Sequence, residues 1–438
     1  MFKRMIGLRL TVVSLLALVG CGAPSNEAPE SQRPAGGRDL TGAIDCADPA
    51  HGDISALVGG MTCFGIQAFG QVTQPGNNVV LSPASIALAF GMARAGAEGA
   101  TAQEIDAVFG FPSESAMREA AFEALDRLLA DAAPAELESP SPDATRPART
   151  GSEPPALQIA NGVFPQIGFP IREKYLATLA AYYGGKAIPV DFGTPDGAKE
   201  IIDNWVSERT RGRIDRLFDS LDRRTRLVLA NAVYLKADWL LPFAEDPTKV
   251  MPFTLADGSK AMVPTMRQLG TMRYTQGDGW QAVELPYAGE RLAMWLLVPS
   301  GDRTPAEVLI EDVLVAVGEE LTQGTVDLHL PRWDFATDIE LIPLLEALGM
   351  KEPFDSEAAD FSGITEAQFW IGDAIHRANI AVDEWGTEAA AVTGLGFATS
   401  GPPPPDAIIH ADRPFAFVIV DTQEHTPLFL GQVANPLA

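Results

Sequence analysis

Hydrophobic and polar positions recur at strand or helix spacing along most of the chain. Residues 375–383 (IHRANIAVD) indicate a buried strand, because apolar side chains recur among small residues without a proline. Residues 78–81 predict a short strand that leads directly into a helix, with Ser82 as the N-cap and Pro83 at the first helical position. Apolar residues at helical spacing continue this helix towards Gly96, a residue that can end it.

The same patterns predict further elements and one long insertion. Strands are expected at 157–164, 187–192, 226–235, 283–285, 293–298 and 326–330, and helices at 61–69, 113–129, 172–183 and 198–206. Residues 131–155 are rich in proline and are interpreted as a disordered insertion. The elements predict a mixed chain whose second half is rich in strands.

The segment after the strand at 375–383 has a different composition. Bulky residues become rare after Gly386, and four consecutive prolines begin at Pro402. From Thr387 onward, every second residue is uncharged, so one face of an extended chain could be buried. The segment can therefore join a sheet up to about Ser400, whereas the prolines beyond it cannot donate to a ladder. The alternative interpretation of this composition is an interdomain linker rich in Ala, Gly and Pro.

Four separated motifs resemble those of the serpin family and follow the family's order. They are N-V-V-L-S-P-A-S-I at 78–86, N-A-V-Y-L-K with Trp239 at 231–239, E-x-G-T-E-A-A at 384–390, and R-P-F-x-F-x-I with L-F-x-G-x-V-x-N-P at 413–436. The resemblance extends from about residue 57 to residue 436. It implies an α+β serpin fold, with a large mixed and antiparallel central sheet, flanking helices and an exposed reactive-centre loop.

The resemblance also implies a suicide-type inhibitor of serine proteases. A target protease would cut the loop at 384–411, and the freed segment would insert into the sheet while the acyl-enzyme is trapped. The family's usual loop length places the cut at Ser400–Gly401, and bonds after Phe397 or Thr399 are alternatives. Lys and Arg are absent between Gly386 and Ala411, so we expect a target that is elastase-like, subtilisin-like or chymotrypsin-like. A non-inhibitory binding or structural protein with the serpin fold is the alternative.

Two groups of site residues follow from the same resemblance. The hinge of the loop comprises Glu384, Gly386, Thr387, Glu388, Ala389, Ala390 and Ala391. A polar cluster beneath the sheet comprises Ser82, Ser85, Asn231 and His376, and Trp239 and Glu384 match positions at the top of the sheet where insertion begins. A lone histidine in an apolar strand is most often a hydrogen-bonded core residue. Directional hydrogen bonds of this kind can be exchanged when strands separate, so we interpret the cluster as a switch element without a catalytic role.

The N-terminus has the pattern of an exported and lipid-anchored protein. Residues 1–20 have a basic start and a short apolar run, which is typical of a signal peptide. A small residue precedes Cys21, and this resembles the lipobox of bacterial lipoproteins; a chance cysteine is the alternative. Residues 21–50 are interpreted as a disordered tether and 51–438 as the serpin domain. We expect a bacterial protein at the cell envelope, at the outer membrane or the cell surface, or an extracellular protein.

Lipidation at Cys21 would leave two cysteines, and their state has two interpretations. A disulfide between Cys46 and Cys63 would persist in an exported protein and could contribute about 3 kcal/mol to stability. Alternatively, Cys63 is a buried free thiol, because it lies in an apolar helical segment.

The net charge and the motif content of the sequence argue against several other functions. The net charge of −26 argues against a nucleic-acid partner. The helix at 113–129 has only Arg118 and Arg127 as basic residues, so we expect no heparin-like cofactor. The sequence has no G-x-S-x-G elbow, no H-E-x-x-H motif, no phosphate-binding glycine loop and no metal-ligand spacing. We therefore expect a monomer that is not an enzyme and needs no cofactor or metal.

Overall fold

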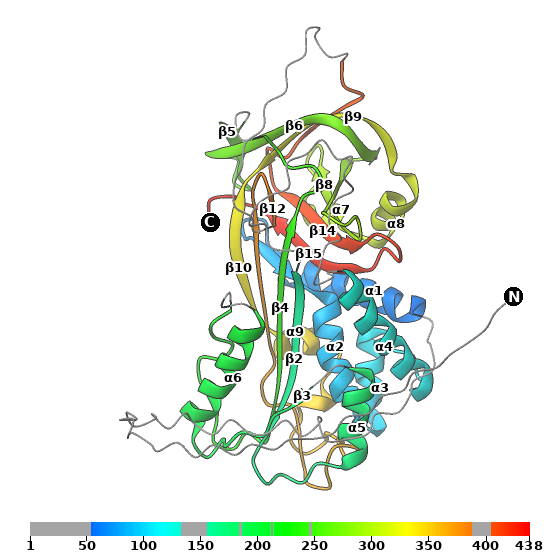
Figure 1. The fold of residues 1–438 in the computed structure, drawn as a ribbon, viewed down its shortest axis with the longest axis vertical. Helices are drawn as coiled ribbons and strands as arrows, with labels where there is room; N and C mark the ends of the chain where they lie inside the picture. The colour runs from blue at the N-terminus through cyan, green and yellow to red at the C-terminus, as the bar shows by residue number, and fades with distance from the viewer. Residues whose placement is uncertain are drawn as a thin grey trace, which may run out of the picture. The chain divides into compact units, whose positions relative to one another are not determined.

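The computed structural model describes residues 54–132, 156–183, 186–210, 212, 214–244, 248–387 and 404–438. Its helices are α1 (Ser55–Val72), α2 (Pro83–Arg94), α3 (Gly99–Phe109), α4 (Ser115–Ala132), α5 (Glu173–Tyr182), α6 (Pro195–Arg209), α7 (Pro305–Val308), α8 (Glu311–Glu320) and α9 (Leu341–Ala347), with a 3₁₀ turn, η2, at Glu352–Phe354. The strands form two sheets (Figure 1).

The six-stranded sheet is mixed and has the order β10-β11-β12-β4-β2-β3. Its strands are β10 (Trp333–Glu340), β11 (Ile375–Val382), β12 (Gly386–Thr387), β4 (Leu227–Asp238), β2 (Ala156–Pro165) and β3 (Lys186–Ala187). Most neighbours are antiparallel, but β11 and β4 run parallel where they pair directly, as do β2 and β3. The parallel contact between β11 and β4 lies between two antiparallel pairs, β10 with β11 and β4 with β2.

The second sheet has the order β1-β15-β14-β8-β7-β6-β9-β13, with β5 paired to β6. Its strands are β1 (Val79–Leu81), β15 (Pro427–Val433), β14 (Phe415–Asp421), β8 (Leu292–Pro299), β7 (Trp280–Pro286), β6 (Lys260–Gly277), β9 (Thr322–Pro331), β13 (Ala407–His410) and β5 (Lys249–Thr254). In β8, β14 and β15 every residue is buried. This burial on both faces explains why their sequences are nearly continuous apolar runs.

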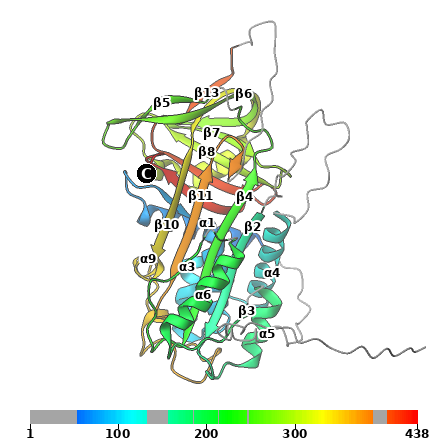
Figure 2. The ribbon, with the colours of Figure 1, turned by 60° about the vertical axis from the view of Figure 1, so that its left-hand side comes forward.

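Strand β4 is buried on both faces, which explains its strong hydrophobic signal in the sequence. Leu229 and Val233 belong to the main core, whereas Val228 and Ala230 pack into a smaller core with residues of α6. Figure 2 shows α6 over one face of β2 and β4, and α2 contacts β4 and also β15 of the second sheet. Helix α2 therefore lies in the core, with all residues from Pro83 to Ala93 buried.

The predicted start of α2 is confirmed. Ser82 is the N-cap, its side-chain oxygen accepts from the backbone N–H of Ser85 at 3.2 Å, and Pro83 is the first helical residue. This cap supplies an acceptor for an N–H group that would otherwise be unpaired in the core. The helix ends at Arg94, two residues before the predicted stop at Gly96.

Some predicted elements differ from the structure. The strand expected at 187–192 is reduced to β3 and an isolated bridge at Val190, and α4 continues to Ala132, so residues 131 and 132 are helical. Strands β5, β6, β10, β13, β14 and β15 were not predicted. In β6, buried and exposed side chains do not alternate strictly, so the hydrophobic pattern of its sequence was a weak signal for a strand. In β10, Trp333, Phe335 and Ile339 are buried between exposed residues, and this alternation was present in the sequence.

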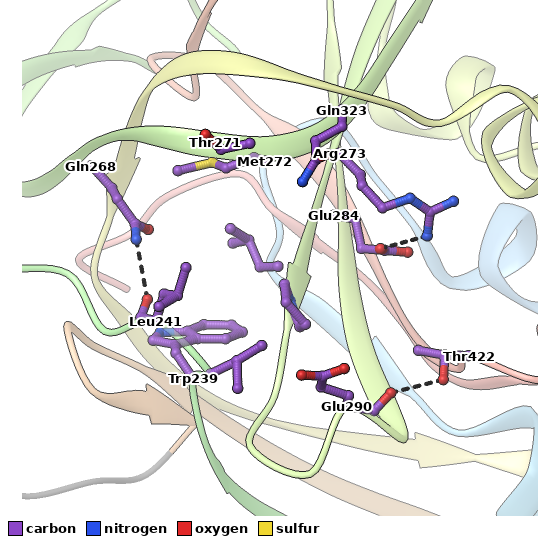
Figure 3. A pocket seen from close by; sticks show the side chains of 13 residues that line it. Trp239, Leu241, Gln268, Thr271, Met272, Arg273, Glu284, Glu290, Gln323 and Thr422 are labelled. Atoms are coloured by element: carbon purple, nitrogen blue, oxygen red, sulfur yellow. Dashed lines mark hydrogen bonds and ion pairs between the residues drawn. The ribbon is translucent and has the colours of Figure 1, made fainter. Parts of the chain in front are cut away.

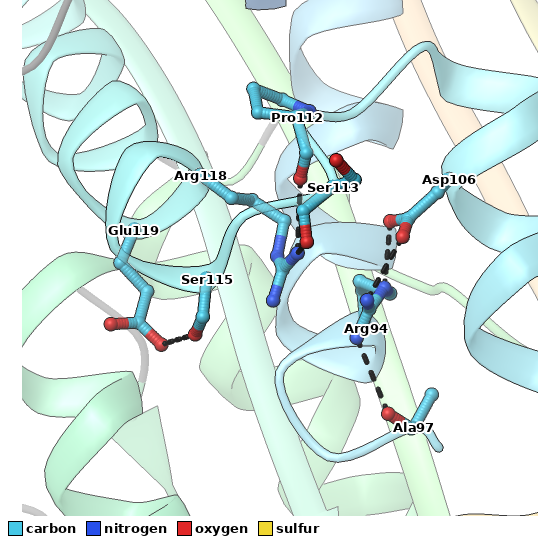
Figure 4. Close-up of polar contacts among 8 residues, drawn as sticks. All are labelled: Arg94, Ala97, Asp106, Pro112, Ser113, Ser115, Arg118 and Glu119. Carbon is cyan, nitrogen blue, oxygen red and sulfur yellow. Dashed lines mark hydrogen bonds and ion pairs between the residues drawn. The ribbon is translucent and has the colours of Figure 1, made fainter. Parts of the chain in front are cut away.

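The two arginines of α4 contact other residues of the chain. Arg118 is 4% exposed, and its guanidinium donates to the carbonyl oxygens of Pro112 and Ser113 at 3.0 and 3.4 Å (Figure 4). Arg127 forms an ion pair with Glu123 one turn away. The absence of a heparin-like partner stays a prediction. Among the helices in the described ranges, none is both long and apolar enough to span a bilayer.

Candidate functional site

The hinge of the predicted loop enters the six-stranded sheet between β11 and β4. Thr387 of β12 pairs antiparallel with Val382 on one side and with Ala237 on the other. Further along, β11 and β4 pair directly, from His376 to Ala378 and from Asn231 to Val233. The loop therefore begins as a two-residue strand at the point where β11 and β4 separate.

Gly386 is required by a close backbone approach. A Cβ atom at this position would lie 2.1 Å from the carbonyl oxygen of Ala237 on β4, which is closer than any real Cβ contact. Only glycine lets β12 come near enough to β4 to form its ladder. The glycine of the predicted hinge motif thus has a defined physical role.

The side chain of Thr387 is buried and hydrogen-bonded. It is 1% exposed, and its hydroxyl lies 2.8 Å from the hydroxyl of Tyr287. Burial raises the pKa of Tyr287, so its hydroxyl stays neutral and available for this bond. The Tyr287 ring stacks on Trp239, with centroids 4.5 Å apart. Trp239 in turn donates its indole N–H to the carbonyl oxygen of Asp383 at 3.0 Å.

Glu384 is a buried carboxylate that anchors the start of the hinge. It is 2% exposed and forms an ion pair with Arg332, whose Nε donates to Oε1 at 2.9 Å. The hydroxyl of Thr248 donates to the same oxygen. A buried charge needs such partners, because it costs several kcal/mol when unpaired. The pKa of the neighbouring Asp383 is raised, and burial of its carboxyl group is the largest cause.

His376 joins β11 to the start of α2 beneath the sheet. It is fully buried, and its Nε2 accepts a hydrogen bond from the backbone N–H of Ser82 at 3.1 Å. Ser82 and Ser85 are fully buried too, and the backbone of His376 is in register with that of Asn231 on β4. The structure thus brings Ser82, Ser85 and His376 together, and the backbone of Asn231 lies beside that of His376 where β11 and β4 touch.

We expect His376 to make the native state sensitive to acid. Burial lowers its pKa from 6.5 to about 3, so stability from the neutral ring is fully present above pH 6.5 and declines as the pH falls towards 3. The loss is about 1.4 kcal/mol per pH unit in this window. Between pH 6.5 and pH 5, urea unfolding should show the wild type losing about 2 kcal/mol more than His376→Gln, whose amide oxygen still accepts from Ser82. Equal pH slopes for the two proteins would contradict this role.

Several predicted site residues lie outside the described part of the chain. These are Glu388, Ala389, Ala390, Ala391, Phe397, Thr399, Ser400, Gly401, Cys21 and Cys46. The two ends of the predicted loop at 384–411 are described, as β12 and as β13, which pairs parallel with β9. Cys63 is exposed on α1, so the interpretation as a buried thiol was wrong; among the described residues, none covers that side of the helix. Its pairing with Cys46 stays a prediction.

Three residues of the hinge site were missed by sequence reasoning. Tyr287, Arg332 and Thr248 hold Thr387 and Glu384, yet they lie 52 to 136 residues away in the chain. No local pattern connects residues so far apart. A buried carboxylate such as Glu384 requires a basic partner, but the sequence does not identify which one. In the described ranges, no group of three or more His, Cys, Asp or Glu side chains is arranged to hold a metal ion.

Comparison with known proteins assigns this architecture to a family. Residues 60–436 match the family model described as serpin (serine protease inhibitor). The chain is a serpin. Members of the family are in general protease inhibitors. The match spans both sheets, the polar cluster and the hinge, so the expected α+β serpin fold, with its large mixed sheet and flanking helices, is confirmed.

Individual relatives agree with this assignment. The serpin is 35% identical to an uncharacterized serpin-like protein from Thermococcus kodakarensis, over 88% of this chain and 87% of the relative. It is 34% identical to Iripin-8 from Ixodes ricinus, over 81% of this chain and 87% of the relative. The crystal structure of the thermophilic serpin tengpin in the native state matches with a TM-score of 0.80 and 23% identity. That match covers 91% of this chain and 99% of tengpin, and at this identity it shows the fold.

Proposed function

We propose that this serpin is a suicide-type inhibitor of serine proteases that cleave after small or apolar residues. The protease serine attacks the carbonyl carbon of the bait residue, the peptide bond to the next residue breaks, and the new amine leaves. The bait residue is then held to the enzyme as an ester. Insertion of the freed segment into the sheet carries the acylated protease away before water can hydrolyse the ester.

The position of β12 is the observation that carries this proposal. Thr387 already pairs with both β11 and β4, and it runs antiparallel to each of them. A strand that continued from Thr387 would replace the parallel contact between β11 and β4 with two antiparallel ladders. Antiparallel pairing is slightly more stable per residue than parallel pairing. The hinge is thus placed to extend into the sheet.

Both neighbouring strands define the same register for this extension. If each ladder continued residue by residue from Thr387, Thr393 would lie beside His376 on β11 and beside Asn231 on β4. These two partners are already in register with each other. The inserted Thr393 would therefore come next to the polar cluster and could exchange hydrogen bonds with it.

The composition of the segment suits this register. Thr387 is buried, so alternate residues would face the core as well. These are Ala389, Ala391, Thr393, Leu395 and Phe397. Glu388 would face the other side of the sheet. With about 1 kcal/mol per backbone hydrogen bond, about ten inserted residues would contribute on the order of 10 kcal/mol before the cost of ordering. That is comparable with the stability of a typical domain.

The cleavage site and the cellular location are part of the same proposal. We place the bait bond at Ser400–Gly401, and the absence of Lys and Arg from the loop disfavours trypsin-like targets.

The signal-like residues 1–20 and the cysteine at position 21 support a lipid-anchored bacterial protein at the cell envelope. Mass spectrometry of the mature N-terminus tests the anchor, and an unmodified Cys21 would refute it.

Incubation with a panel of proteases tests the mechanism. A form lacking residues 1–21 is mixed with elastase, chymotrypsin, subtilisin and trypsin, and the products are analysed by denaturing gel and intact mass. We expect a covalent complex with at least one of the first three enzymes and a released peptide that begins at Gly401. Cleavage of the loop without a complex would favour the alternative, a binding or structural protein with the serpin fold. A peptide that begins elsewhere would move the bait bond.

A further inference from the structure

A cavity of about 410 Å³ lies beside the hinge, between the end of β4 and strands β6 and β7. Figure 3 shows Met272 and Arg273 on one side of it and Trp239 and Leu241 on the opposite side. Its volume is in the range of cavities that bind small organic molecules. None of the residues described above as sites of the loop or of the polar cluster lines it, apart from Trp239.

The wall of this cavity is largely apolar. Trp239, Met272 and Leu285 are buried side chains that line it, and Leu241 lines it while 55% exposed. Apolar walls with a few polar groups are typical of sites that bind the body of a small ligand and fix its orientation by the polar groups. The cavity therefore favours an apolar or aromatic body.

The charges on the wall leave one carboxylate without a partner. Glu284 is buried, and its two oxygens accept from Arg273 at 2.8 Å and from the indole N–H of Trp295 at 3.0 Å. Glu290 also lines the cavity; it is exposed, its backbone carbonyl accepts from the hydroxyl of Thr422, and among the described residues its carboxylate has no hydrogen bond or ion pair. The charges of Arg273 and Glu284 balance, so the net charge of the lining is negative and lies on Glu290.

We propose that this cavity binds a small organic cation, with its apolar or aromatic body against Trp239 and Met272 and its amine near Glu290. Such a ligand would form an ion pair with the exposed carboxylate and remove apolar wall from water at the same time. An anionic ligand of the same shape would meet the uncompensated charge of Glu290.

A ligand in this cavity would contact the hinge through one side chain. Trp239 stacks on Tyr287, and the Tyr287 hydroxyl bonds to Thr387, the first inserted residue of the loop. Trp239 also donates to the carbonyl oxygen of Asp383. A bound ligand would change the packing of Trp239. It would therefore change the rate at which β12 extends into the sheet. This coupling rests on the function proposed above, whereas the binding site does not.

Dansylcadaverine, an aliphatic primary amine linked to an aromatic dansyl group, is a suitable probe, and its N-acetyl derivative is the neutral control of nearly the same shape. Fluorescence titration of the full chain should show one site with a dissociation constant of about 10 μM. The acetylated probe should bind about fivefold more weakly, because it has lost its charge and cannot pair with the exposed Glu290. Glu290→Gln should abolish this difference between the probes, whereas Glu357→Gln, at an exposed site elsewhere, should preserve it. Equal binding of both probes to the wild type would refute the role of Glu290.

A second pair of variants tests the location. Thr271→Trp fills the mouth of the cavity from an exposed strand position and should abolish saturable binding. Val250→Trp, an exposed position on the neighbouring β5 that does not line the cavity, should leave binding unchanged. Thermal unfolding establishes that both variants are folded. Absence of saturable binding to the wild type, or binding that survives Thr271→Trp, would overturn the proposal.

The effect on inhibition is measured separately. With a protease that forms the covalent complex, saturating probe should change the rate of complex formation by about fivefold for the wild type and leave the Thr271→Trp variant unaffected. An unchanged rate with bound probe would overturn the coupling to the hinge. Failure to form a complex with any protease would refute the proposed function, and the binding titration would still decide the site.

Discussion

Replacing Thr387 by arginine is expected to convert this serpin from an inhibitor into a substrate. Thr387 is 1% exposed between two strands, and its hydroxyl bonds to Tyr287. An arginine there would bring a charge into the core without a partner, at a cost of about 3 kcal/mol or more. We expect the arginine to keep β12 out of the sheet before cleavage. Insertion must then begin by burying this side chain, so the trapping step should slow by more than about 100-fold relative to hydrolysis of the acyl-enzyme.

The measurement is the number of inhibitor molecules consumed per protease inactivated. For Thr387→Arg, the gel should show cleaved serpin and active protease with little covalent complex. Thr387→Ser, which keeps the hydroxyl and the small volume, should still form the complex. Full inhibition by Thr387→Arg would refute insertion as the trapping step. If neither Thr387→Arg nor Thr387→Ser forms the covalent complex, position 387 is required for folding of the native protein.

Replacing Trp239 by alanine should give the largest loss of stability among substitutions at the hinge. The indole is 3% exposed, stacks on Tyr287 and donates to the carbonyl oxygen of Asp383. Removing it creates a cavity and leaves that carbonyl without its donor, which should cost about 3 to 5 kcal/mol. The free energy of unfolding from urea titration at pH 7 is the measurement.

A matched exposed tryptophan provides the control. Trp370 is 38% exposed, and Trp370→Ala should change the free energy of unfolding by less than about 1 kcal/mol. Trp239→Phe keeps the aromatic stack and should lose less than Trp239→Ala. Similar losses for Trp239→Ala and Trp370→Ala would mean that the packing around Trp239 adds little to stability.

Local patterns in the sequence predicted those elements whose signal is contained within a few residues. The cap of α2 by Ser82 and Pro83 is one example, because both residues act on the turn they begin. Strand β11 is another, since its alternate residues His376, Ala378, Ile380 and Val382 are buried. The prediction of a strand at 187–192 was wrong, because this segment pairs with β2 only near its start and forms one isolated bridge at Val190. A short apolar run becomes a strand only where another strand lies beside it.

The sequence by itself determined that this chain contains the serpin motifs and a hinge able to join a sheet. Glycine at 386 and small residues after it are properties of the chain alone, and they predict where a strand can be added. The tertiary structure decided what holds that hinge. Glu384 pairs with Arg332, Thr387 with Tyr287, and Ser82 with His376, across 52, 100 and 294 residues. Periodicity sets which face of an element is buried, but it carries no information on which distant element covers that face. The cavity beside Trp239 is a consequence of that packing, so it too could be found only in the folded protein.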